Sequence, residues 1–212
     1  MKNFRFLIFW LLLALGTATG CAQNNANTVD EGVVINGVKW ATRNVDKPGT
    51  FADKPEDFGM LYQWNRRVGW SVTEPIINSN GGTAWDTTEV TGTIIWEKSN
   101  DPSPVGWRVP TLEEIKSLLD TEKVTNEWTT QNDVNGRKFT DRTSGKSIFL
   151  PAAGWRYDSS GTLGRGVGED GAYWSSTRDV SKSAYSFTLV GFARWAETAS
   201  NNFGFSVRCV AE

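Results

Sequence analysis

Acidic side chains are the groups in this chain that could support catalysis, and two pairs of them are adjacent in sequence. Glu113 and Glu114 stand in GWRVPTLEEI, and Glu169 and Asp170 stand in a glycine-rich stretch. Two carboxylates facing across a cleft suffice for glycoside hydrolysis. Glu113 and Glu114, however, open a predicted helix, where the helix dipole favours negative charge. Glu169 and Asp170 lack the alternating acidic ligands of a calcium loop and are predicted to form a solvated turn.

Histidine is absent from the sequence. Its absence excludes Ser-His-Asp and Cys-His nucleophile pairs and histidine-based metal sites. Cys209 lies in FGFSVRCV, where Phe203, Phe205 and Val207 share its face of an extended segment, so we predict a buried structural thiol. We therefore predict no catalytic residue, no metal site and no cofactor; calcium is possible, but no motif supports it.

Tryptophan is the residue type that most favours a binding function, with 11 copies in the chain. Its ring is a platform for sugar rings and an anchor at protein interfaces. Trp195 lies between predicted strands and is the main candidate for exposure, followed by Trp85 beside Gly81 and Gly82. Five others lie in or beside predicted elements and are assigned to the core: Trp40, Trp64, Trp107, Trp155 and Trp174.

The tripeptide GWR occurs at residues 106–108 and again at residues 154–156. A capped helix follows the first copy and a turn-rich loop follows the second, so the copies do not belong to a duplicated unit. Each is interpreted as a scaffold corner, in which glycine permits a close backbone approach and arginine binds nearby carbonyls or acids. A paired ligand clamp is the alternative, because Arg156 adjoins the candidate ligand loop.

Capping and alternation predict the elements that must position these residues. Thr111 and Glu114 have capping-box spacing, and an apolar stripe follows them, so a helix is expected over residues 112–120. Asn36-Gly37 predicts a hairpin turn, and a second tight turn is expected at residues 134–137. Strands are predicted over residues 33–35, 38–40, 147–151, 185–190 and 203–210.

The first 20 residues predict export. Lys2 and Arg5 precede the ten-residue apolar run FLIFWLLLAL, which is too short to span a bilayer, and small residues then lead to Cys21. We expect a lipoprotein signal with Cys21 acylated; an ordinary signal cleaved nearby, for example after Ala22, is the alternative. Residues 21–31 form a tether, and residues 32–212 form one domain.

Charge limits the partners of this domain. Removal of residues 1–20 takes away Lys2 and Arg5 and no acid, so 22 basic and 24 acidic residues become 20 and 24, a net charge of −4. A nucleic-acid binder needs a concentrated basic face, so no nucleic acid is expected. No polybasic segment favours anionic lipids either, so membrane attachment is expected through the lipid anchor only.

Five segments occur in one order: GWRVPTLEEIKSLL, FLPAAGWR, GAYWSST, AYSF and GFSVRCV. Together they resemble the FISUMP family (Fibrobacter succinogenes major paralogous domain), found in exported proteins of Bacteroidetes and Fibrobacter relatives. The resemblance covers residues 32–210. It implies an α+β, C-type lectin-like fold, with antiparallel β-sheets, flanking helices and a long irregular loop at residues 157–172. The Glu-Pro-Asn-like triplet of calcium-dependent lectins is missing from that loop.

These observations predict an exported lipoprotein of the outer membrane or cell surface that binds without catalysis. Its partner would be a glycan or a surface protein, held by residues 157–172 and 191–202. Two alternatives are a structural subunit of an adhesion or fimbria-like assembly and a carboxylate-dependent glycan hydrolase. The candidate contact residues are Arg156, Tyr157, Arg165, Asp170, Arg194 and Trp195.

Overall fold

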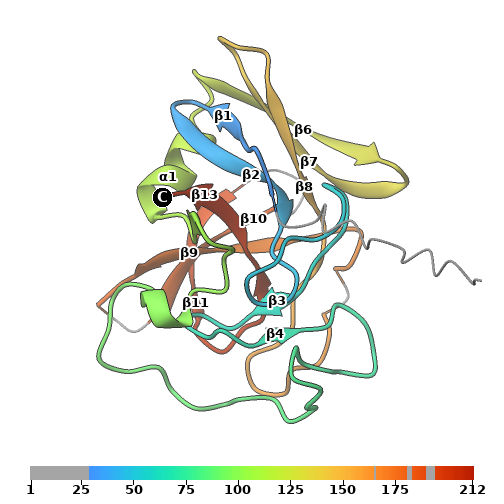
Figure 1. The fold of residues 1–212 in the computed structure, drawn as a ribbon, viewed down its shortest axis with the longest axis vertical. Helices are drawn as coiled ribbons and strands as arrows, with labels where there is room; N and C mark the ends of the chain where they lie inside the picture. The colour runs from blue at the N-terminus through green and yellow to red at the C-terminus, as the bar shows by residue number, and fades with distance from the viewer. Residues whose placement is uncertain (1–28, 165, 181–182, 190–193) are drawn as a thin grey trace, which may run out of the picture.

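The computed structural model describes residues 29–164, 166–180, 183–189 and 194–212, and for residues 194–197 it describes the backbone alone. Three β-sheets dominate this part of the chain, with the helix α1 (Leu112–Leu118) on one flank and the 3-10 turn η1 (Lys98–Asn100) in a long connection. Figure 1 shows the three-stranded sheet and one hairpin of the four-stranded sheet in the upper part of the molecule, and the six-stranded sheet below them.

The four-stranded sheet joins the two ends of the domain. Its order is β1 (Val33–Ile35), β2 (Val38–Asn44), β13 (Arg208–Ala211) and β5 (Trp107–Arg108), with antiparallel pairing throughout. The predicted hairpin is confirmed, because β1 and β2 flank Asn36 and Gly37, whose φ angles are 46° and 81°. Positive φ at both positions is what a two-residue hairpin turn requires.

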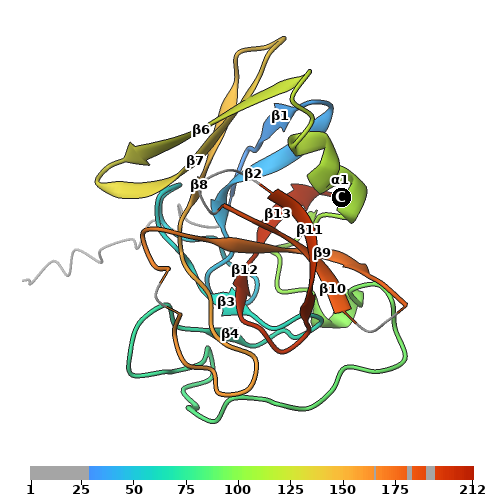
Figure 2. The ribbon, with the colours of Figure 1, turned by 180° about the vertical axis from the view of Figure 1, so that it is seen from behind.

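The six-stranded sheet crosses the middle of the molecule, as the reverse view in Figure 2 shows. Its one parallel contact joins β12 (Phe205–Ser206) to β9 (Ala172–Arg178), and its other pairings are antiparallel. In order, its strands are β11 (Arg194–Ser200), β10 (Ser183–Thr188), β9 (Ala172–Arg178), β12 (Phe205–Ser206), β3 (Leu61–Tyr62) and β4 (Gly69–Trp70).

The three-stranded sheet consists of β6 (Val124–Gln131), β7 (Val134–Asp141) and β8 (Ser147–Pro151). The predicted turn at residues 134–137 is wrong, because β7 runs through it and Gly136 pairs with Thr129 and Pro151. The chain reverses instead at Asn132 and Asp133, with φ angles of 47° and 64°. Asparagine and aspartate tolerate this left-handed region. The turn therefore forms at Asn132 and Asp133 instead of at Asn135 and Gly136.

The predicted fold class is wrong. An α+β, C-type lectin-like domain with flanking helices was expected, whereas the described residues form a nearly all-β, sandwich-like fold with one α-helix of seven residues. The apolar stripe that begins at Leu112 forms one short capped helix and does not extend into the longer helices that the expected fold requires. Strand pairing, rather than helix packing, therefore builds most of the core.

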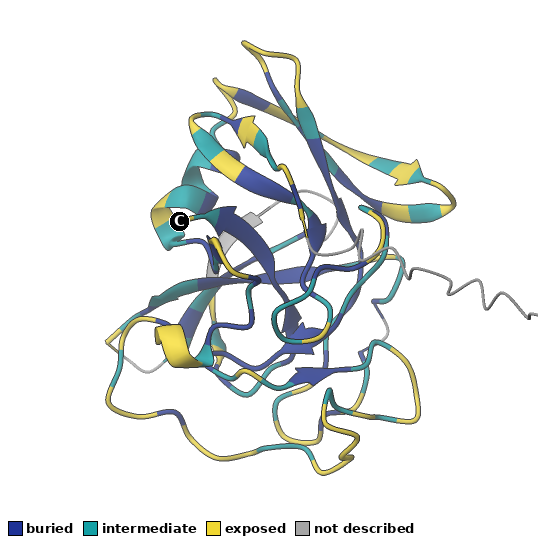
Figure 3. Ribbon diagram, in the orientation of Figure 1, coloured by how far each residue is buried: buried dark blue, intermediate teal, exposed yellow. Residues whose placement is uncertain are grey.

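Two apolar clusters hold the layers together. One gathers buried aromatic residues between the four- and six-stranded sheets, and the other lies under α1 and the three-stranded sheet. Figure 3 shows the central strands buried and the β6–β7 tip and the lower connection exposed. Of the tryptophans assigned to the core, Trp155 is half-buried against it, and four are buried: Trp40, Trp64, Trp107 and Trp174.

The predicted C-terminal strand contributes to both larger sheets. It divides into β12 and β13, and residues 204–210 are buried on both faces. The fully buried guanidinium of Arg208 donates to Asn44 Oδ1 and to the carbonyls of Ala41 and Phe149. Cys209 is a free, buried thiol 3.0 Å from Ser103 Oγ, which confirms its expected place in the core.

The helix and the two GWR corners follow their sequence signals. Thr111 and Glu114 form the capping box, and α1 ends two residues before the predicted limit. Gly106 and Gly154 both have positive φ, at 83° and 66°. Arg108 pairs with Glu114 at 2.6 Å, next to its own corner. Each tripeptide is therefore a corner whose glycine adopts a left-handed conformation.

Candidate ligand-binding pocket

Three of the six predicted contact residues have described side chains. Tyr157 is 43% exposed and packs its ring against Trp155 and Phe203. Asp170 is half-buried; its burial, with the neighbouring Glu169 charge, raises the pKa of its carboxyl. Among these described residues, the Asp170 side chain makes no hydrogen bond or ion pair with Tyr157 or Arg156.

Arg156 is fully buried, and its guanidinium is occupied by the protein itself. It donates to the carbonyls of Ser71, Thr73 and Gly161, at 2.6 to 2.8 Å. Its Nη1 also lies 3.0 Å from Glu74 Oε1. These bonds tie the second GWR corner to the connection that follows β4, and its role as a ligand contact stays a prediction.

The other predicted contacts cannot be placed as side chains. Arg194 and Trp195 lie on β11, paired with Thr188 and Phe187, and the structure describes only their backbone. Arg165 lies outside the described residues, as does Cys21.

A polar pocket of about 360 Å³ opens elsewhere, beside the β3–β4 connection. Figure 1 places β3 and β4 in the lower half of the molecule, next to the long connection that leads to η1. Residues from the β3–β4 connection, the loop after β4 and η1 line it: Gln63, Asn65, Arg66, Arg67, Val68, Trp70, Asn78, Ala84, Asp86 and Asn100.

Many pocket side chains are held in place by hydrogen bonds. Gln63 donates from Nε2 to the carbonyls of Asp86 and Asn202, at 2.6 and 3.1 Å. Asn78 Oδ1 accepts from the amides of Asn80 and Gly82, both at 2.9 Å, and so closes the turn that carries it. These bonds fix amide groups around the pocket, where each amide carries both donors and acceptors.

Arg66 and Asp86 form the charged pair of the pocket wall. Their Nη1 and Oδ2 atoms lie 3.4 Å apart, and Arg66 Nη2 also donates to Thr88 Oγ1. Burial acts to raise the pKa of Asp86, but donation by the Thr88 hydroxyl and amide, together with the Arg66 charge, lowers it below its ordinary value. Asp86 is therefore an ionised hydrogen-bond acceptor at neutral pH.

Two tryptophans connect the pocket with the predicted ligand loop. Trp70 lines the pocket, is 2% exposed, and its ring lies 4.7 Å from that of Trp85 at a tilt of 51°. Trp85 donates from Nε1 to the carbonyl of Asp158 and packs against Gly161, so closely that a Cβ there would lie 2.5 Å from its ring. Trp85, expected to be exposed, is instead half-buried between the pocket and residues 157–172.

Sequence reasoning missed this pocket because its residues form no motif. They come from short irregular stretches between residues 63 and 100, and the signal there was only the density of tryptophans, Trp64, Trp70, Trp85 and Trp96. It also missed Trp128, which is 38% exposed in a shallow hollow beside Asn135 and Glu169.

Comparison with known protein families adds one match. A family model described as the Fibrobacter succinogenes major domain matches residues 14–211. The chain belongs to this family. No curated protein and no solved structure matched it. The resemblance inferred from the five ordered segments is thus confirmed for the Fibrobacter succinogenes major domain, although the fold expected from it is not.

Within the described part of the chain, no helix has the length and apolar character needed to cross a bilayer. The same residues contain no group of three or more cysteine, aspartate or glutamate side chains that could hold a metal ion.

Proposed function

We propose that this chain is an exported, non-catalytic glycan-binding protein and that the pocket beside the β3–β4 connection is its binding site. A volume of about 360 Å³ fits within the range of small-ligand sites. Amides, guanidinium groups and one carboxylate line the pocket, and Val68, Ala84 and the 2% exposed Trp70 form its apolar part. This mixture suits a sugar, whose hydroxyls both donate and accept hydrogen bonds and whose ring faces are apolar.

The observation that carries the proposal is the polar lining of this pocket, which includes two residues with unsatisfied donors. Trp70 Nε1 and Arg66 Nε are buried and have no acceptor among the described residues. Buried polar groups are nearly always hydrogen-bonded, so an exception calls for an explanation. Both donors belong to residues that line one polar pocket, whereas other buried donors without an acceptor in the described part of the chain, such as Trp40 Nε1 and Arg178 Nε, lie outside it. The pair therefore supports a ligand site together with the polar lining of the pocket.

The absence of catalysis is part of the proposal. Asp86 is the one carboxylate among the ten pocket residues, and glycoside hydrolysis by paired acids needs a second across the cleft. The lowered pKa of Asp86 also makes it a poor proton donor at neutral pH. When the recombinant protein is incubated with an oligosaccharide that it binds, the number of reducing ends in the oligosaccharide should not increase.

Export and anchoring stay as inferred from sequence. The basic head, the ten-residue apolar run and Cys21 support a lipoprotein at the outer membrane or cell surface. Metabolic labelling with a fatty-acid analogue tests this directly: the wild-type chain should take up label, and Cys21→Ser should not.

A blocking substitution tests the binding site. Ala84 is exposed and lines the pocket, so Ala84→Trp should fill it without disturbing the core. Val105→Trp adds the same ring at a fully exposed position outside the pocket. Binding should be measured by calorimetry against oligosaccharides of cellulose, xylan, galactan and galacturonan. We expect Ala84→Trp to weaken affinity by about tenfold or more, that is, by at least about 1.4 kcal/mol, and Val105→Trp to leave it unchanged. If both variants bind as the wild type does, the site lies elsewhere.

A structural role is the second candidate, and β6 favours it. This eight-residue strand is the edge of its sheet, contains neither proline nor glycine, and carries the exposed Trp128. An unprotected edge is a template for pairing with another chain. Light scattering should find a monomer if glycan binding is the function; an oligomer dispersed by Thr129→Pro, without any glycan bound, would favour assembly.

A further inference from the structure

The pocket beside the β3–β4 connection contains more positive than negative charge. Arg66 and Arg67 supply two guanidinium groups, and Asp86 supplies the one carboxylate among the ten lining residues. Asp86 lies 3.4 Å from Arg66, which accounts for one of the two positive charges. The charge of Arg67 is left without a carboxylate in the pocket.

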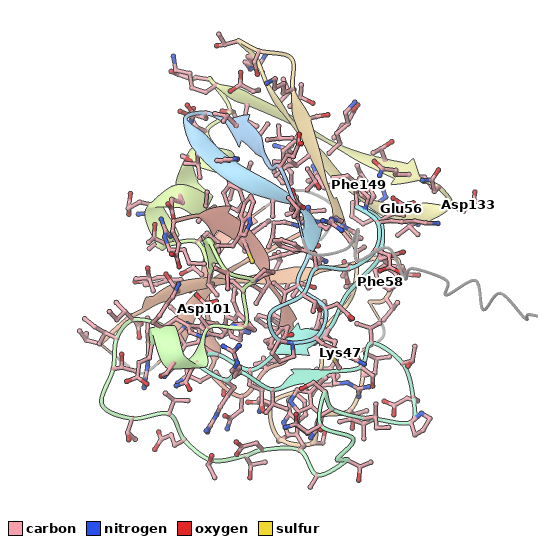
Figure 4. All side chains as sticks on the ribbon, viewed as in Figure 1. Lys47, Glu56, Phe58, Asp101, Asp133 and Phe149 are labelled. Carbon is pink, nitrogen blue, oxygen red and sulfur yellow. The ribbon has the colours of Figure 1, made fainter. Side chains whose placement is uncertain are left out.

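The Arg67 side chain makes few interactions within the protein. It is exposed, and its hydrogen bond is donated from Nη1 to the carbonyl of Asp101 at 2.7 Å. The carboxylate of Asp101, located beside η1 in Figure 4, instead accepts from the amides of Ser103 and Val109. No ion pair of Arg67 occurs among the described residues, so its remaining N–H groups are open to a ligand.

We infer that this pocket binds an acidic glycan, with Arg67 holding an anionic group of the sugar. A planar guanidinium pairs with two oxygens of a carboxylate or sulfate at once, and such charge-assisted bonds are stronger than those to neutral groups. The inference rests on the proposed function and adds the ligand class to it. The anion would be a ring carboxylate, as in a uronic acid, or a sulfate ester; both present the same oxygens to Arg67.

The test compares each acidic glycan with its own neutral form. Galacturonan oligosaccharides and their carboxyl-reduced counterparts differ only at C6, and a sulfated galactan and its desulfated form provide the second pair. Calorimetry on the full mature chain at low salt should show the acidic member of one pair binding about tenfold tighter than the neutral member, with the difference shrinking as salt rises. The pair that shows the preference identifies carboxylate or sulfate.

Arg67→Gln should abolish that preference and leave affinity for the neutral member within about twofold, because a polar group of similar size remains but its charge does not. Arg67→Lys should keep part of the preference. Arg142→Gln is the matched control, since Arg142 is also exposed and donates one hydrogen bond, from Nε to the carbonyl of Thr121. It should behave as the wild type does.

The outcomes separate this inference from the proposed function. Equal affinity for acidic and neutral members, or a preference that survives in Arg67→Gln, overturns the acidic specificity while glycan binding stands. If no oligosaccharide of either kind binds, the proposed function fails, and the inference fails with it. Urea unfolding of each variant, unchanged from wild type, shows that loss of binding is not loss of folding.

Discussion

Arg156 Nη1 lies 3.0 Å from Glu74 Oε1, and this ion pair joins a fully buried guanidinium to a carboxylate whose side chain is 55% exposed. The same guanidinium donates to the carbonyls of Ser71, Thr73 and Gly161. The corner at residues 154–156 therefore anchors both the connection after β4 and the start of the 157–172 loop. The other corner, at residues 106–108, pairs with β13 through its backbone, and its arginine side chain holds the neighbouring helix start through Glu114.

The two corners should differ in their contribution to stability. Arg156→Met removes the donors of three carbonyls in a buried setting and is expected to lower the free energy of unfolding by about 3–5 kcal/mol. Arg108→Met breaks a partly exposed pair and should cost about 1 kcal/mol. Urea denaturation followed by tryptophan fluorescence measures both values. Equal losses would show that the buried network at Arg156 adds nothing beyond an ordinary surface pair.

The Asp141 carboxylate should make stability fall in acid. The backbone N–H of Ser144, with those of Asn36 and Thr143, donates to this carboxylate and lowers its pKa to about 2. A carboxyl with a lower pKa in the folded chain stabilises the fold above its unfolded pKa, near 4, and that contribution is lost as pH falls to about 2. Asp141→Asn should therefore lower the urea midpoint at pH 7, and the difference from the wild type should shrink greatly as pH falls to about 2.

The control for this titration is Asp133→Asn, in the exposed β6–β7 turn, where asparagine tolerates the same backbone conformation. Figure 4 shows Asp133 at the hairpin tip near Glu56, whose carboxylate accepts from Gln131 and Asn132 at 3.1 and 2.6 Å. Asp133→Asn should leave the midpoint unchanged at both pH values. A difference for Asp141→Asn that is as large at pH 2 as at pH 7 would contradict the assignment.

Cys209 should be chemically silent in the folded protein. The thiol is fully buried against Ser103, and burial raises its pKa. A reagent therefore cannot reach the sulfur atom, and the reactive thiolate form does not accumulate. In a chain carrying Cys21→Ser, a thiol reagent should label Cys209 at least about a thousandfold more slowly under native conditions than in denaturant, since labelling requires opening of the core. Rapid native labelling would show that this edge of the core opens locally.

Gly136 should resist substitution, although its backbone is ordinary strand. A Cβ at this position would lie 2.3 Å from the carbonyl oxygen of Leu150 and 2.6 Å from the Phe149 ring. Gly136→Ala is therefore expected to cost about 3 kcal/mol through overpacking. Gly37→Ala, at positive φ with no neighbour within 4 Å, should cost about 1 kcal/mol from backbone conformation alone. Thermal denaturation of both variants separates steric from conformational cost.

Signals carried by a few adjacent residues were readable from the sequence alone. The turn at Asn36 and Gly37, the cap formed by Thr111 and Glu114, and the buried face of Cys209 were all predicted correctly. In each case, the deciding interaction is a local hydrogen bond, a φ angle or a simple alternation of apolar residues. The five ordered segments likewise identified the family, because residue identity and order are properties of the sequence.

Tertiary structure alone decided the rest. The turn moved from residues 134–137 to Asn132 and Asp133 because β7 pairs along its full length with β6 and β8, and no local preference records that pairing. The all-β architecture also depends on ladders between distant segments, such as β13 with β2 and β12 with β3. The pocket is likewise assembled from segments up to 37 residues apart, from Gln63 to Asn100. The sequence determines which side chains are present, but only packing brings Arg67, Asp86 and Trp70 to one cavity. The physical reason is that contact energies depend on distance in space rather than on distance along the chain.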